Sequence, residues 1–172
     1  TGYVAVSDVD GVAAAMQADG GTVRKGPEDI PGVGRFAVVA DPQGAVLCLF
    51  KGQGDMEPAA ADAPGSIGWH ELMTSDLKAG WAFYAKAFGW EKADAMDMGD
   101  LGPYQLFTHD GVQIGGMMKR PPFIPVSHWR YYINVPDIKA ALDKVKSGGG
   151  ELLQGPMQVP GGQWIVQCQD PQ

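Results

Sequence analysis

The chain has few cysteines, no long apolar run and no excess of basic residues. Its two cysteines, Cys48 and Cys168, lie in separate apolar stretches, so neither a disulfide framework nor a zinc knuckle is indicated. No apolar run approaches the ~18 residues that a membrane-spanning helix needs. Lysine and arginine number 13 against 20 acidic residues, and the net charge of −7 argues against nucleic acid or an anionic membrane as a partner. We therefore expect a soluble, cytoplasmic protein.

Glycine and proline are abundant instead. The 172 residues include 25 glycines and 13 prolines, a density that is typical of short strands joined by tight turns. The hydrophobic content of 45% is enough for a buried core.

One segment of the chain is used twice. Residues 3–43 align with residues 132–172 at a constant offset of 129 without insertion or deletion, and twelve positions are identical. The identical positions include the helix-opening Asp8 and Asp137 and the two Asp-Pro-Gln sequences. A match that keeps strand, helix and turn signals in register indicates a repeated supersecondary unit.

Three such modules are predicted, each with the order βαβββ except that the third lacks its last strand. An aspartate stands before each predicted helix, where its side chain can cap the first turn: Asp8, Asp76 and Asp137. The Gly26-Pro27 and Gly155-Pro156 pairs are interpreted as turns. We expect strands at 3–6, 22–24, 36–40 and 45–50 in module one, at 67–73, 90–96, 104–109 and 112–118 in module two, and at 129–135, 151–153 and 164–169 in module three.

These patterns resemble the vicinal oxygen chelate superfamily, which includes glyoxalase I, bleomycin-resistance proteins and extradiol dioxygenases. The resemblance lies in the strand-Asp-helix openings, in Phe-Tyr-Ala-Lys-Ala-Phe-Gly-Trp at 83–90, and in Asp-Pro-Gln-Gly at 41–44 before a strand. The two-domain actinobacterial glyoxalase-like type is the most similar. It implies an α+β fold of βαβββ modules with curved mixed sheets, paired to enclose a cleft.

The resemblance also implies a division of the chain. Residues 1–51 would be a single module whose partner module is missing or supplied by another chain, as in a homodimer. Residues 52–66 would be a linker, and residues 67–172 a glyoxalase-like domain of two modules without its last strand.

Enzymes of this superfamily hold a divalent metal with side chains from the first and last strands of each module. The usual first-strand ligand lies seven residues before the helix-opening aspartate, which here gives Thr1, Trp69 and Arg130. The usual last-strand glutamate is replaced by Cys48 in module one. None of these is a ligand of that class, so we expect no cofactor and no ordinary metal centre, although a divalent metal stays possible.

Glu71 and His70 are the residues through which a metal could still bind. Neighbours in a strand point to opposite faces, so both cannot reach one metal. If Leu72 faces the helix, Glu71 shares the cleft face with Trp69. Glu71 is then either a catalytic acid or base or metal ligand, or a structural carboxylate, whereas His70 is expected to be a packing histidine. The other two histidines are expected to be solvated or capping side chains.

Aromatic and thioether side chains on these strands suggest a pocket for a flat or apolar molecule, with an ordinary inter-sheet core as the alternative. The candidate ligand-binding residues are Trp69, Glu71, Met117, Trp129, Arg130, Tyr132 and Trp164.

Three functions stay open at this point. The first is a small-molecule-binding protein that holds a partly apolar ligand in the inter-module cleft without an ordinary metal centre. The second is a metal-dependent lyase, isomerase or dioxygenase of the same superfamily. The third is an interaction or regulatory protein with a vestigial cleft.

Overall fold

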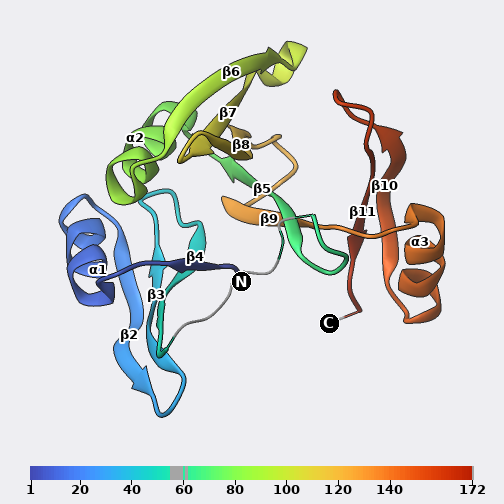
Figure 1. Ribbon diagram of the computed structural model, residues 1–172. Helices are drawn as coiled ribbons and strands as arrows, with labels where there is room; N and C mark the ends of the chain where they lie inside the picture. The colour runs from blue at the N-terminus through green and yellow to red at the C-terminus, as the bar shows by residue number, and fades with distance from the viewer. Residues whose placement is uncertain (55–59, 61, 172) are drawn as a thin grey trace. The chain divides into compact units, whose positions relative to one another are not determined.

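The computed structural model describes residues 1–54, 60 and 62–171 (Figure 1). The fold is α+β, as expected, and modules one and two have the βαβββ order. The chain divides into two compact units, one of Thr1–Ala61 with Ile67–Tyr132 and the other of Asp62–Ser66 with Ile133–Gln172. No helix among the described residues is both long enough and apolar enough to cross a membrane.

Module one is a four-stranded sheet covered by one helix. Its elements are β1 (Tyr3–Ala5), α1 (Val9–Ala18), β2 (Thr22–Ile30), β3 (Gly34–Ala40) and β4 (Val46–Gly52). The strand order is β1-β4-β3-β2, in which β1 and β4 are parallel and the other pairs antiparallel. Helix α1 begins where the Asp8 side chain accepts a 3.0 Å bond from the Gly11 N–H, as expected for a cap.

The turn predicted at Gly26-Pro27 is wrong, because β2 continues through this pair. The pairing of β2 with β3 shifts register between Lys25 and Glu28, which makes the Gly-Pro pair a bulge. Gly26 has a φ of 75°, a conformation that favours glycine. Gly155-Pro156 likewise lies inside a strand, where the pairing is irregular between Gln154 and Met157.

Module two has the same order and gains a fifth strand. Its elements are β5 (Ile67–Thr74), α2 (Leu77–Phe88), β6 (Glu91–Asp97), the 3₁₀ turn η1 (Gly99–Leu101), β7 (Pro103–His109) and β8 (Val112–Lys119). The sheet order is β6-β7-β8-β5-β9, so that β9 (His128–Ile133), the opening strand of module three, lies beside the opening strand of module two (Figure 1).

One hydrophobic core runs through modules one and two. It joins the buried faces of α1 and α2 to the sheet residues beneath them, and Tyr84 of α2 is fully buried within it. Trp90 and Phe107 stack with ring centroids 4.7 Å apart, and Trp129 of β9 meets Trp90 edge-on. The aromatic rings thereby fix how β9 packs against module two.

The second compact unit contains α3 (Ile138–Ser147) and an antiparallel pair formed by β10 (Glu151–Gln158) and β11 (Trp164–Gln169). Asp137 caps α3 by accepting from the Lys139 and Ala140 N–H groups, and Leu142 of α3 is buried. The predicted linker at 52–66 lies partly outside the described residues. The predicted domain boundaries, and the pairing of modules two and three as one domain, stay predictions.

Candidate functional site

Glu71 stands in the middle of β5 with only 7% of its surface exposed. The alternation of the strand places Trp69, Glu71 and Met73 on one face, and His70 and Leu72 on the other. Leu72 is fully buried in the core beneath the helices, so Glu71 faces away from them, as expected.

Three side chains donate hydrogen bonds to the Glu71 carboxylate. Tyr104 Oη of β7 donates to Oε1 over 3.1 Å. Arg130 Nη1 and Tyr132 Oη, both from β9, donate to Oε2 over 3.3 Å each. Trp69 Nε1 donates in turn to Tyr104 Oη over 2.8 Å. The buried carboxylate is therefore satisfied by a connected network, and the Arg130 charge offsets part of the cost of burying it.

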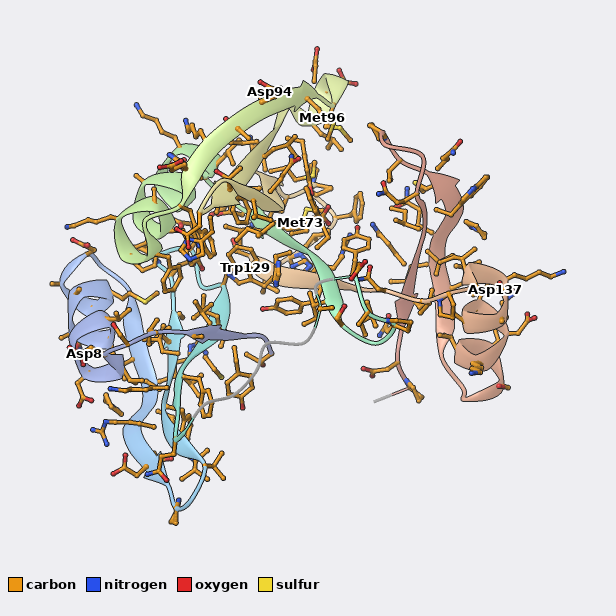
Figure 2. All side chains as sticks on the ribbon, viewed as in Figure 1. Asp8, Met73, Asp94, Met96, Trp129 and Asp137 are labelled. Carbon is orange, nitrogen blue, oxygen red and sulfur yellow. The ribbon has the colours of Figure 1, made fainter. Side chains whose placement is uncertain are left out.

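Apolar side chains surround this network. Met73, Tyr104 and Met118 are buried in one cluster, and Trp69, Met96 and Leu106 pack against it partly buried. Figure 2 labels Met73 and Met96 of this cluster. We call the surface formed by Trp69, Glu71, Met73, Tyr104, Met118, Arg130 and Tyr132 the Glu71 face.

Glycine at position 116 leaves room for the Tyr104 ring. A Cβ on Gly116 would lie 2.1 Å from Tyr104 Cε1, far inside van der Waals contact. The glycine in β8 therefore allows Tyr104 to lie flat over the strand and reach Glu71.

The Tyr104 phenol stays a hydrogen-bond donor over the whole physiological range. Burial raises the pKa of Tyr104, and the nearby negative charge of Glu71 raises it further. Both effects keep the proton on the phenol oxygen.

The structure brings four of the predicted site residues together and separates three. Trp69, Glu71, Arg130 and Tyr132 share the Glu71 face. Met117 pairs beside Leu72 and lies in the core, as does Trp129, whose Nε1 donates to Tyr84 Oη over 3.0 Å. Trp164 opens β11 in the other compact unit with 55% of its surface exposed, and its part in a site stays a prediction.

Sequence reasoning missed Tyr104 and Met118. Met117 was expected on this face, but its neighbour Met118 lies there instead. The parallel register pairs Met118 with Met73, which is on the same face of β5 as Glu71. Side chains alternate between the two faces along β8 as they do along β5, and aligning the two strands would have put Met118 on the face of Glu71. Nothing local to Tyr104 marks it out.

The described residues around Glu71 do not suit a divalent cation. Among the described residues, no group of three or more histidine, cysteine, aspartate or glutamate side chains could hold a metal ion. At Glu71 itself, the carboxylate oxygens already accept from two phenols and a guanidinium, and the Arg130 charge lies 3.3 Å away, where it would repel a metal. His70 faces the other way, and its Nδ1 donates to the Ile114 carbonyl over 2.9 Å.

Comparison with known proteins identifies relatives of the chain. The sequence profile of the glyoxalase/bleomycin resistance protein/dioxygenase superfamily matches residues 66–172. The anthracycline biosynthesis protein DauV of Streptomyces sp. strain C5 is 32% identical over 163 residues, which cover 94% of this chain and 58% of DauV. CFP32 of Mycobacterium tuberculosis, which carries a provisional glyoxylase name, is 29% identical over 171 residues, which cover 99% of this chain and 65% of CFP32. The chain thus spans less than two thirds of the length of these relatives.

Solved structures share the fold. The 2,3-dioxygenase LapB of Pseudomonas sp. KL28 matches with a TM-score of 0.59 at 14% identity, over 95% of this chain and 64% of LapB. The Mn(II)-bound glyoxalase of Novosphingobium aromaticivorans matches with a TM-score of 0.57 at 19% identity, over 96% of this chain and 61% of that glyoxalase.

Proposed function

The chain belongs to the glyoxalase/bleomycin resistance protein/dioxygenase superfamily, and we propose that it binds a small, partly apolar molecule on the Glu71 face. The observation that carries this proposal is the buried Glu71 carboxylate, held by donors from β7 and β9 among methionine and tryptophan side chains. Ligand sites typically combine such apolar walls with a few fixed polar groups.

Burial of a charge supports a functional origin for this arrangement. A carboxylate with a paired guanidinium gives little or no net stability compared with apolar residues of similar size. A sheet face that only needed to pack would do so more stably with aliphatic side chains. The network instead holds one acceptor and one cationic donor side by side.

The chemistry of the face favours a planar aromatic ligand with adjacent hydroxyl and carbonyl groups. The thioethers of Met73 and Met118 and the Trp69 ring suit the face or edge of an aromatic ring. A ligand hydroxyl can donate to Glu71, and a ligand carbonyl can accept from Arg130, whose side chain keeps 25% exposure and has further N–H groups. The name of DauV, an anthracycline biosynthesis protein, points to ligands of this kind.

Glu71 and Arg130 have separate roles in this proposal. Glu71 fixes the guanidinium through the 3.3 Å contact and accepts from the ligand, and Arg130 donates to the ligand. Tyr104, which itself accepts from Trp69 Nε1, holds the carboxylate from the other side. The proposed binding needs no metal, because the donors around Glu71 do not suit one.

Calorimetric titration with 1-hydroxyanthraquinone and with unsubstituted anthraquinone tests the proposal. We expect the hydroxylated probe to bind about tenfold more tightly, and Glu71→Gln to remove most of that preference. Val112→Ala, at an exposed position on β8, is the matched control and should bind as the parent does.

Two other results would each favour a different function. Metal analysis that finds a stoichiometric divalent ion in the parent and none in Glu71→Ala would favour the metal-dependent lyase, isomerase or dioxygenase. Failure of both anthraquinones and of a broad aromatic and aldehyde panel to raise the melting temperature would favour an interaction protein.

A further inference from the structure

A cavity lies on the face of β5 opposite Glu71, wholly within the first compact unit. Its volume is about 470 Å³, and it is bounded by β1 and α1 of module one and by α2, β5, β8 and β9. We call it the His70 crevice. Volumes of roughly 300–1,000 Å³ are usual for small-molecule sites.

Aromatic side chains form much of its wall. Phe88, Trp90, Trp129 and Tyr131 line it together with Ile114. Trp90 and Trp129 meet edge-to-face with centroids 5.9 Å apart and pack against the core, so these walls are preformed.

His70 supplies a directed polar group. Its Nδ1 lies 2.9 Å from the Ile114 carbonyl oxygen, which can only accept, so the proton sits on Nδ1. With the proton on Nδ1, Nε2 of an uncharged ring is left as an acceptor, and within the described part of the chain Nε2 has no hydrogen-bond partner. The Tyr131 ring meets the His70 ring edge-on at 6.0 Å and fixes its orientation.

We propose that the His70 crevice is a second small-molecule site, separate from the Glu71 face, which takes a flat aromatic molecule whose hydroxyl or N–H donates to His70 Nε2. The two sites lie back to back because His70 and Glu71 are neighbours in one strand and point to opposite faces. The crevice combines apolar walls with a fixed acceptor, and this pairing selects for a ring that carries a donor.

Methyl NMR separates the two sites in one experiment. Protein labelled at isoleucine δ1 and methionine ε methyls is titrated with 2-naphthol, and then with 2-methoxynaphthalene, which has the same rings but no donor. Ile67 and Ile114 line the crevice, whereas Met73 and Met118 report on the Glu71 face. We expect 2-naphthol to shift both isoleucine signals and to bind about tenfold more tightly than the methyl ether.

Two variants test whether His70 Nε2 is the acceptor and whether the probe occupies the His70 crevice. His70→Phe keeps an aromatic ring and removes Nε2, so 2-naphthol should bind it no better than 2-methoxynaphthalene. Ala87→Trp, on the last turn of α2, fills the crevice without touching the His70 bond and should abolish binding of both probes. Gln113→Ala, which is exposed on β8, serves as the control.

The proposal is overturned if the Ile67 and Ile114 methyl signals stay unmoved at saturating probe. It is also overturned if the two probes bind equally and His70→Phe changes neither. Shifts confined to Met73 and Met118 would assign the probe to the Glu71 face and leave the crevice as packing space only.

Discussion

Tyr84 of helix α2 donates a hydrogen bond of 3.0 Å to Oδ2 of Asp41, which lies in the turn before β4 of module one. Oδ1 of Asp41 accepts from the Gln43 and Ala45 N–H groups, and Trp129 Nε1 donates to Tyr84 Oη. This buried network ties module one, module two and the opening strand of module three together. It connects the Asp-Pro turn to the wall of the His70 crevice through Trp129.

Tyr84→Phe should destabilise the protein. It leaves Oδ2 of Asp41, a residue 3% exposed, without its phenol donor and removes the acceptor of Trp129 Nε1. We expect a loss of about 1–3 kcal/mol in the free energy of unfolding, measured by urea titration. Tyr3→Phe, at a tyrosine that is 64% exposed, is the matched control and should stay within about 0.5 kcal/mol of the parent. Equal effects of the two substitutions would contradict the network.

Asp41 should make stability fall as the pH rises through the acidic range. Burial raises the pKa of Asp41 above its ordinary value of 3.8, so the native state binds this proton more tightly than the unfolded chain does. Its contribution is fully present below pH 3.8 and is lost as the pH rises through the raised pKa. Urea titrations from about pH 3 to pH 7 should therefore show the parent losing stability relative to Asp41→Asn, which cannot ionise. A difference that is constant or grows with pH would contradict the raised pKa.

Gly116→Ala should weaken ligand binding more than it weakens the fold. The new Cβ would displace the Tyr104 ring, which can turn away, and Glu71 would lose its Oε1 donor. We expect about tenfold weaker binding of 1-hydroxyanthraquinone. Gly115→Ala is the contrasting variant, since its Cβ would lie 2.2 Å from the His70 backbone oxygen and should cost at least about 1–3 kcal/mol of stability. A Gly116→Ala protein that binds like the parent would show that Tyr104 has no part in the site.

Glu71 and Arg130 should be energetically coupled. A double-mutant cycle of Glu71→Gln and Arg130→Gln is expected to give a coupling free energy of about 1 kcal/mol, because the side chains are only 9% and 25% exposed and lie 3.3 Å apart. Additivity within about 0.3 kcal/mol would mean that the contact does not fix Arg130.

Much of the Glu71 face could be predicted from one strand. The side chain of Leu72 had to face the helix, and strand alternation then grouped Trp69 with Glu71. Tyr132 lies five residues before Asp137, as Glu71 lies five before Asp76, so the sequence pattern puts both at the same position of their opening strands, and the Tyr132 phenol reaches Glu71. These inferences needed only local periodicity and an internal match.

Features that depend on contacts between strands could not be predicted in the same way. Met117 and Met118 are alike in sequence, and only the register with β5 decides which of them faces Glu71. Tyr104 reaches Glu71 only because Gly116 lies beneath its ring. Gly26-Pro27 has the local signature of a turn, yet pairing with β3 resumes beyond it and makes it a bulge.

The most direct test of the ligand site is a titration of protein labelled at its methionine methyls with 1-hydroxyanthraquinone. The signals of Met73 and Met118 should shift and saturate together, while Met16, which is buried on the core-facing side of α1 in module one, should stay unchanged. Saturable binding that leaves both Met73 and Met118 unmoved would contradict the assignment of the Glu71 face as the ligand site.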